Sequence, residues 1–217
     1  MERVGVSIQE LSFLEFAEPS LEQGFMRCVR QGAAAINVVP LFLLPAGHIK
    51  QDIPRILDSL QLRYPQIKVE INDPFGVQSQ LLDAIAKLVR SLAGEVSATD
   101  QVVIIGRGSS DPVVQEDFSR LARSLQTRLG TIRVTVCYLA AARPSLHDGL
   151  ESVVSVVKHG NGGKIIVVPY LLFSGLLLAE VERNVRERRK QGLTVIQTGP
   201  LHFHRVIEDI VVNRAIR

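Results

Sequence analysis

The chain has 217 residues, 46% hydrophobic and 22% charged, which suits a globular protein with a substantial core. Aromatic residues make up only 5% and tryptophan is absent, which argues against a surface that stacks single-stranded nucleic acid. The formal charge of +3 comes from basic residues mixed with acidic ones, as in the run 182–190, which we interpret as a solvated helix face. A small anionic substrate fits this distribution better than a nucleic-acid duplex.

The cysteines and apolar runs indicate a cytoplasmic protein with no membrane segment. Cys28 and Cys137 are far apart and form no CxxC pair, so we expect buried, unreactive thiols. The first residues show no signal-peptide pattern. The apolar run 165–179 is too short to span a bilayer, and Pro169 and Gly175 interrupt it.

Apolar patterns predict that strands alternate with helices along the whole chain. In the first half we expect strand 8–16, helix 19–31, strand 35–44, helix 49–64, strand 67–71 and helix 77–92. After a polar linker, 94–101, we expect strand 102–105, helix 112–129, strand 133–139, helix 146–158, strand 164–172, helix 176–191, strand 194–198 and a closing helix from His202. This alternation predicts an α/β fold with parallel sheets.

The two halves of the chain resemble each other, which indicates two similar lobes, 1–97 and 98–217. The matching positions are 13–21 with 138–146, 38–43 with 167–172, Gly24 with Gly149, Gly47 with Gly175, and Pro74 with Pro200.

The repeat is uneven at its start. The second half opens with strand 102–105, the loop 106–112 and a helix, all before the part that matches Phe13. Their equivalents in the first half would lie upstream of Met1. We therefore expect the first lobe to be incomplete, through either a reading frame that begins too late or a genuine truncation.

Glu15 and His48 are the candidate site residues, because each stands at the carboxyl end of an expected strand and open parallel sheets bind ligands at that end. Their counterparts in the second half are Ala140 and Leu176, so only the first lobe keeps polar groups there. An imidazole with a carboxylate suits Fe²⁺ or Co²⁺, and either group can accept a proton. Structural alternatives stay open, since His48 could cap a helix and Glu15, on one strand face with Leu11 and Phe13, could pair with a lysine.

Other motifs favour structural interpretations. The loop 106–112 could hold an anion with its amides and Arg107, but Asp111 before Pro112 is an ordinary helix start. His202 and His204 are two residues apart and would not share a helix face, so they form a weak metal motif. The remaining histidines, His147 and His159, should face solvent.

Four motifs, FLEFAEPSLEQGF, VVPLFLLPAGHIKQDIP, IIGRGSSDP and VVPYLLFSG, closely resemble the sirohydrochlorin chelatases of the two-lobed CbiX/SirB type. The resemblance implies two flavodoxin-like lobes with the tetrapyrrole in the cleft between them. It also implies insertion of Fe²⁺, or of Co²⁺ in cobalamin synthesis, into sirohydrochlorin without ATP or an organic cofactor.

The resemblance also implies roles for individual residues. The second active histidine of the family falls on His48, and its acidic metal-site residue falls on Glu15. The first histidine of the family belongs to an HGS motif that is absent from this sequence. Arg107 stands at the equivalent place in the second lobe, and with Lys50 it is a candidate contact for substrate carboxylates.

We therefore expect a monomeric sirohydrochlorin ferrochelatase. The alternatives are a sirohydrochlorin cobaltochelatase, an inactive form that only binds the tetrapyrrole, and an anion-binding module that uses the loop 106–112 and does not need His48.

Overall fold

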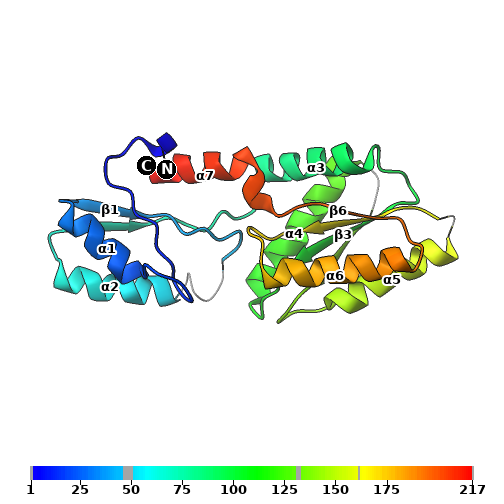
Figure 1. The fold of residues 1–217 in the computed structure, drawn as a ribbon, viewed down its shortest axis with the longest axis horizontal. Coiled ribbons are helices and arrows are strands. Elements are labelled where there is room, and N and C mark those ends of the chain that lie inside the picture. Colours follow the sequence, from blue (N-terminus) through cyan, green and yellow to red (C-terminus); the bar gives the residue numbers. More distant parts are fainter. Residues whose placement is uncertain (1, 46–50, 131–132, 161, 217) are drawn as a thin grey trace. The chain divides into compact units, whose positions relative to one another are not determined.

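The computed structural model describes residues 2–45, 51–130, 133–160 and 162–216. Its contacts divide the chain into two compact units, unit 1 (Met1–Gly76 with Glu208–Arg217) and unit 2 (Val77–Ile207). Both chain ends lie together in unit 1, where the Arg3 guanidinium pairs with Glu208 at 2.9 Å and with Asp209 at 2.5 Å (Figure 1).

Unit 1 contains a small parallel sheet, in which β1 and β2 pair from Ala35 opposite Lys68 to Val38 opposite Ile71. Helices α1 and α2 supply most of its core, which consists of Phe25, Ile53, Leu57, Leu60 and Ile67. The elements are η1 (Glu2–Val4), α1 (Leu21–Arg30), β1 (Ala35–Val38), α2 (Ile53–Arg63), β2 (Lys68–Ile71) and most of α7 (Arg205–Ala215).

Unit 2 contains a four-stranded parallel sheet in the order β4-β3-β5-β6. Helices α5 and α6 cover one face and α3 and α4 the other, so the two inner strands, β3 and β5, are buried (Figure 1). The elements are α3 (Ser79–Ala93), β3 (Gln101–Gly106), α4 (Pro112–Leu129), β4 (Val134–Tyr138), α5 (Leu146–His159), β5 (Ile165–Pro169), α6 (Leu176–Lys190), β6 (Val195–Gln197) and η3 (Leu201–Phe203). The predicted parallel α/β class is confirmed.

The expected strand 8–16 is wrong. Residues 8–12 form no strand, and Phe13 makes only an isolated bridge to Ser20. The matching strand of unit 2, β4, pairs along its length with β3, and the described part of unit 1 holds no counterpart of β3. A strand without a neighbour cannot satisfy its backbone hydrogen bonds, so this apolar pattern gives extended loop instead.

The last helix of each repeat packs in the other repeat's unit: α3 follows β2 but belongs to unit 2, and α7 follows β6 but mostly belongs to unit 1. Arg214 near the end of α7 donates to the carbonyl oxygens of Asp73, of Pro74 at 2.9 Å and of Phe75 at 3.3 Å. The predicted halves 1–97 and 98–217 describe the copies of the repeat, and that division stays a prediction.

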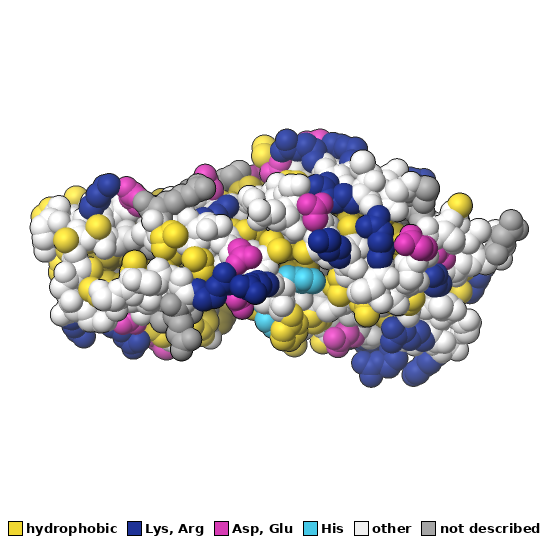
Figure 2. Space-filling view, turned by 90° about the horizontal axis from the view of Figure 1, so that it is seen from above, with side chains coloured by type: hydrophobic (Ala, Val, Ile, Leu, Met, Phe, Trp, Pro, Cys, Tyr) yellow, Lys and Arg dark blue, Asp and Glu magenta, His cyan; other side chains and the backbone are white. Residues whose placement is uncertain are grey.

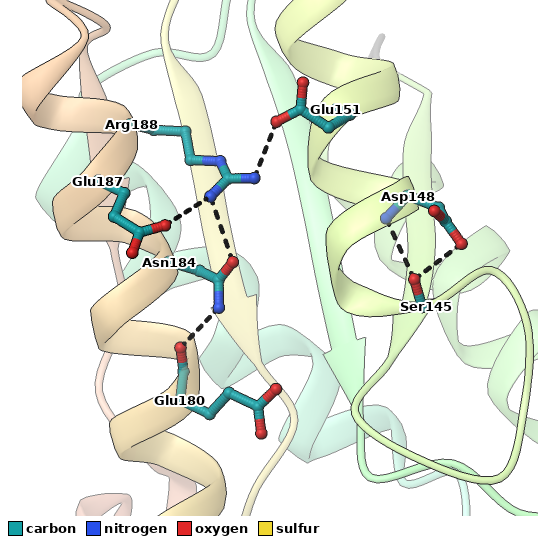
Figure 3. A network of polar contacts seen from close by, with 7 residues as sticks. All are labelled: Ser145, Asp148, Glu151, Glu180, Asn184, Glu187 and Arg188. Carbon is teal, nitrogen blue, oxygen red and sulfur yellow. Dashed lines mark hydrogen bonds and ion pairs between the residues drawn. The ribbon is translucent and has the colours of Figure 1, made fainter.

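The run 182–190 on α6 is not entirely a solvated face. Arg188 is buried, and its guanidinium donates to Glu151 of α5 at 2.8 Å and to Asn184 at 3.2 Å (Figure 3). The Asn184 amide in turn donates to the Glu180 carbonyl at 3.0 Å. The ion pair between Arg188 and Glu151 joins α6 to α5. The exposed side chains of the run 182–190 agree with the predicted solvated helix face.

On the face shown in Figure 2, basic side chains lie in separate groups with acidic side chains among them. This mixture agrees with the charge distribution expected from the sequence. None of the helices in the described part of the chain has the length and apolar character needed to cross a bilayer.

Candidate functional site

Glu15 lies in an exposed loop, not at the end of a strand as predicted. The loop is closed at its base, where the Phe13 amide donates to the Pro19 carbonyl at 2.8 Å. The Ser20 hydroxyl accepts from the Gln23 amide at 3.2 Å, so the loop runs directly into a capped α1. The Glu15 carboxylate is therefore held on a fixed loop without the free-energy cost of burial.

The second unit contains the same loop. The Tyr138 amide donates to the Pro144 carbonyl at 3.0 Å, and Ser145 caps α5 as Ser20 caps α1. Ala141 has a φ angle of 53°, close to the 63° of Phe16, its counterpart. The shared backbone supports the repeat and shows that the difference between Glu15 and Ala140 is one of side chains alone.

His48 belongs to the segment 46–50, which lies outside the described residues, as does Lys50. The chain on both sides of that segment is anchored in unit 1, since Phe42 packs against the core cluster and Ile53 is part of it. Leu14, next to Glu15, packs against the same cluster. The Glu15 loop and both ends of the His48 segment thus start from one apolar core.

No group of three or more histidine, cysteine or acidic side chains is arranged to hold a metal ion among the residues that the structure describes. Glu15 has polar surroundings of its own and is not a lone carboxylate. Glu18, in the same loop, accepts from the Ser20 amide at 3.1 Å, which gives this carboxylate a structural role at the start of α1.

The loop 106–112 has the structural role favoured by the sequence. Asp111 caps α4 by accepting from the Val113 amide at 2.9 Å. A Cβ atom on Gly108 would lie 1.7 Å from the Ala140 carbonyl oxygen, and its φ is +94°. Glycine is therefore required for close packing, and Arg107 extends from the loop as an exposed side chain.

The remaining histidines do not form a second site among the described residues. His202 lies on the 3-10 turn η3, where its Nδ1 is 3.1 Å from the Leu172 carbonyl oxygen and its ring is 3.8 Å from that of Phe203. Burial lowers the pKa of His204. His147 and His159 are exposed, as predicted.

The thiols match the prediction of unreactive cysteines, although only Cys137 is buried as predicted. Cys137 is buried under α5, and burial raises its pKa to about 12. Burial also raises the pKa of the half-buried Cys28, and the nearby charge of Glu10 adds to this effect. Neither thiol is prepared to act as a thiolate at neutral pH.

Comparison with known proteins places these features in a family. A family model described as CbiX matches residues 1–92 and 101–217. The sirohydrochlorin ferrochelatase of Priestia megaterium is 38% identical over 199 residues, which cover 92% of this chain and 73% of that protein. The sirohydrochlorin cobaltochelatase of the same species is 30% identical over 211 residues, covering 95% of this chain and 68% of the relative.

A solved structure, SirB from Bacillus subtilis with Fe3+, matches with a TM-score of 0.83 and 36% sequence identity, covering 97% of this chain and 81% of that one. The match extends over both units, so the resemblance that the motifs indicated is confirmed. The chain belongs to the CbiX family of chelatases.

Proposed function

We propose that this chain is a sirohydrochlorin ferrochelatase, which inserts Fe²⁺ into sirohydrochlorin to make siroheme. The proposal rests on the sequence identity of nearly the whole chain to two relatives, which is higher to a ferrochelatase than to a cobaltochelatase. Identity is 38% to the ferrochelatase of Priestia megaterium but 30% to the cobaltochelatase of the same species. We also expect a cytoplasmic monomer that uses no organic cofactor, with iron as a substrate.

The reaction exchanges two pyrrole protons for one divalent ion, so the site must bind the ion, release it to the macrocycle and accept protons. Glu15 and His48 are the residues to which we assign these tasks. A neutral imidazole can ligate Fe²⁺ or take a proton, and a carboxylate can assist either step. Few protein ligands are an advantage, because the ion has to leave them.

Local anchoring supports the pairing of these two residues. Leu14, Phe42 and Ile53 fix the Glu15 loop and the flanks of the His48 segment to one core cluster. The carboxylates of sirohydrochlorin need cationic contacts, and Arg107, which is exposed after β3, is a candidate with Lys50.

Removal of either site residue tests the assignment. We expect Glu15→Ala and His48→Ala each to lower the rate of Fe²⁺ insertion by about 100-fold or more, the range typical of lost acid–base groups. Glu18→Gln is the matched control, since Glu18 is a carboxylate of the same loop that serves the helix start. Circular dichroism checks the fold of each variant. Full activity in folded His48→Ala would contradict the assignment.

The alternative function, cobaltochelatase, has weaker support in the 30% identity to the cobalt enzyme. Similar ligand sets often accept both ions in vitro, so metal competition at cellular concentrations distinguishes the two functions. A chain that binds sirohydrochlorin but inserts neither ion would instead be a tetrapyrrole-binding form.

A further inference from the structure

Phe16 is the most exposed large apolar side chain among the described residues, with a relative accessibility of 102%. It follows Glu15 directly, and its backbone lies in the left-handed region with φ at 63°. Bulky residues rarely occupy this region, because the side chain crowds the backbone. Both properties oppose a phenylalanine at this position on grounds of stability alone.

The repeat supplies an internal comparison. Ala141 occupies the matching position in unit 2, where its φ is 53° and it is also exposed. The loop of unit 2 has the same hydrogen bond at its base without any ring at this place. The phenyl ring of Phe16 is therefore not needed to form the loop.

Contacts with other aromatic rings do not explain why Phe16 is exposed. The exposed Phe173 and Phe203 lie 5.7 Å and 3.8 Å from the ring of His202, measured between centroids. Phe16 takes part in none of the ring contacts found among the described residues. An exposed apolar ring on a left-handed backbone, beside a carboxylate assigned to metal delivery, has the character of a ligand contact.

The substrate has a matching surface. A tetrapyrrole is a flat conjugated ring with apolar faces and carboxylates around its rim, and a metal ion enters through a face. A side chain next to the metal-delivering group is within reach of that face, and aromatic rings pack well against flat conjugated surfaces.

We propose that Phe16 is a positioning residue that packs against one face of sirohydrochlorin and orients the macrocycle over Glu15. This inference rests on the proposed function and adds a determinant of substrate affinity to it. Phe16→Ala reproduces the loop of unit 2, so the variant should fold with a thermal stability equal to or slightly above that of the wild type.

The test is the binding of metal-free sirohydrochlorin to the full chain, followed by quenching of the macrocycle's fluorescence. We expect Phe16→Ala to raise the Kd by about tenfold, as for the loss of one aromatic contact, and Phe16→Tyr to bind like the wild type. Leu62→Ala is the matched control, because Leu62 is exposed on α2 of the same unit and should leave the Kd unchanged. In insertion assays the effect of Phe16→Ala should appear in KM more than in kcat.

The outcomes separate the two proposals. Wild-type chain that binds sirohydrochlorin, with Phe16→Ala binding equally tightly, overturns the role of Phe16 and leaves the chelatase assignment in place. Equal weakening by Phe16→Ala and Leu62→Ala also overturns it, because the effect would then be one of general apolar surface. Wild-type chain that binds no sirohydrochlorin overturns both.

Discussion

Glu15 and Ala140 stand at matching places in two loops with the same backbone, and both side chains are exposed. The loop therefore tolerates either residue, and the carboxylate is retained in only one copy. The counterpart of His48, Leu176, is an exposed first residue of α6 and provides no ligand atom. The two loops therefore share one backbone conformation and differ in the side chains that they carry.

This asymmetry predicts that a carboxylate moved to the second loop has no function. Ala140→Glu should leave Fe²⁺ insertion unchanged, and Glu15→Ala combined with Ala140→Glu should be as inactive as Glu15→Ala alone, because no imidazole accompanies the new carboxylate. The three variants are compared by initial insertion rates. Recovery of activity in the double variant would show that the assignment of the site to the first lobe is wrong.

The repeat allowed Glu15 and His48 to be selected from sequence, because it showed which polar residues had been lost from the other copy. The setting of Glu15 was not predictable in the same way. Alternation over Leu11, Phe13 and Glu15 favoured a strand, and the outcome depended on a neighbouring strand that the pattern itself cannot reveal. The sequence aligns Phe16 with Ala141 but does not reveal the exposure or the φ angle of Phe16.

Asp100 shows how a single side chain joins two elements. It lies just before β3, is 2% exposed, and accepts from the amides of Lys164 at 2.7 Å and Ser97 at 2.8 Å. Burial raises its pKa, but these hydrogen bonds and the Lys164 ammonium, 3.6 Å away, outweigh burial and hold the pKa below its ordinary value. The contact fastens the start of β3 to the start of β5.

The lowered pKa predicts how stability depends on pH. Since the folded chain holds the Asp100 pKa below the unfolded value of about 3.9, ionised Asp100 stabilises the fold above that pH and its contribution is lost as the pH falls through the folded-state pKa. We expect Asp100→Asn to lower the free energy of unfolding by about 1–3 kcal/mol at pH 7. Urea unfolding at pH 7, 5 and 3 should show this difference shrinking at pH 3. An equal difference at pH 3 and pH 7 would contradict it.

Most helices and strands of unit 2 were predictable because local patterns and tertiary contacts agree there. Helix α4 (Pro112–Leu129) begins and ends at the predicted residues, with Asp111 as its cap and Gly130 after it. Strand β1 ends at Val38, well before the predicted Leu44, since apolar character continues into a loop that packs on the core. The sequence also could not show that Arg188 is buried, because its partner Glu151 lies on another helix and comes close only in the folded chain.

At the scale of the whole molecule, the exchange of the last helices makes each unit depend on the other repeat. Unit 1 includes Glu208–Arg217, which come from the second half of the sequence. Arg214 holds this part in place through carbonyl groups at 73–75, and its guanidinium lies 5.4 Å from the centre of the Phe75 ring. A repeat in the sequence cannot show such an exchange, because both arrangements have the same pattern of elements.

Because α7 packs in unit 1, a substitution near the C-terminal end of the sequence should destabilise unit 1 and not unit 2. Arg214→Ala should lower the stability of unit 1 by about 1–2 kcal/mol through lost charge-assisted hydrogen bonds. Hydrogen exchange should become faster in β1 and β2 and stay unchanged in β3. Arg186→Ala, which removes an exposed arginine of α6, is the matched control. Equal acceleration in both units would show that Arg214 does not act through unit 1.

The most direct test of the chelatase assignment is anaerobic metal insertion by the purified 217-residue chain. Sirohydrochlorin is mixed with Fe²⁺ or Co²⁺, and the absorbance of the macrocycle is followed with and without protein. We predict insertion above the spontaneous rate, with dependence on Glu15 and His48. Insertion of both ions at the spontaneous rate by a well-folded chain would contradict the assignment.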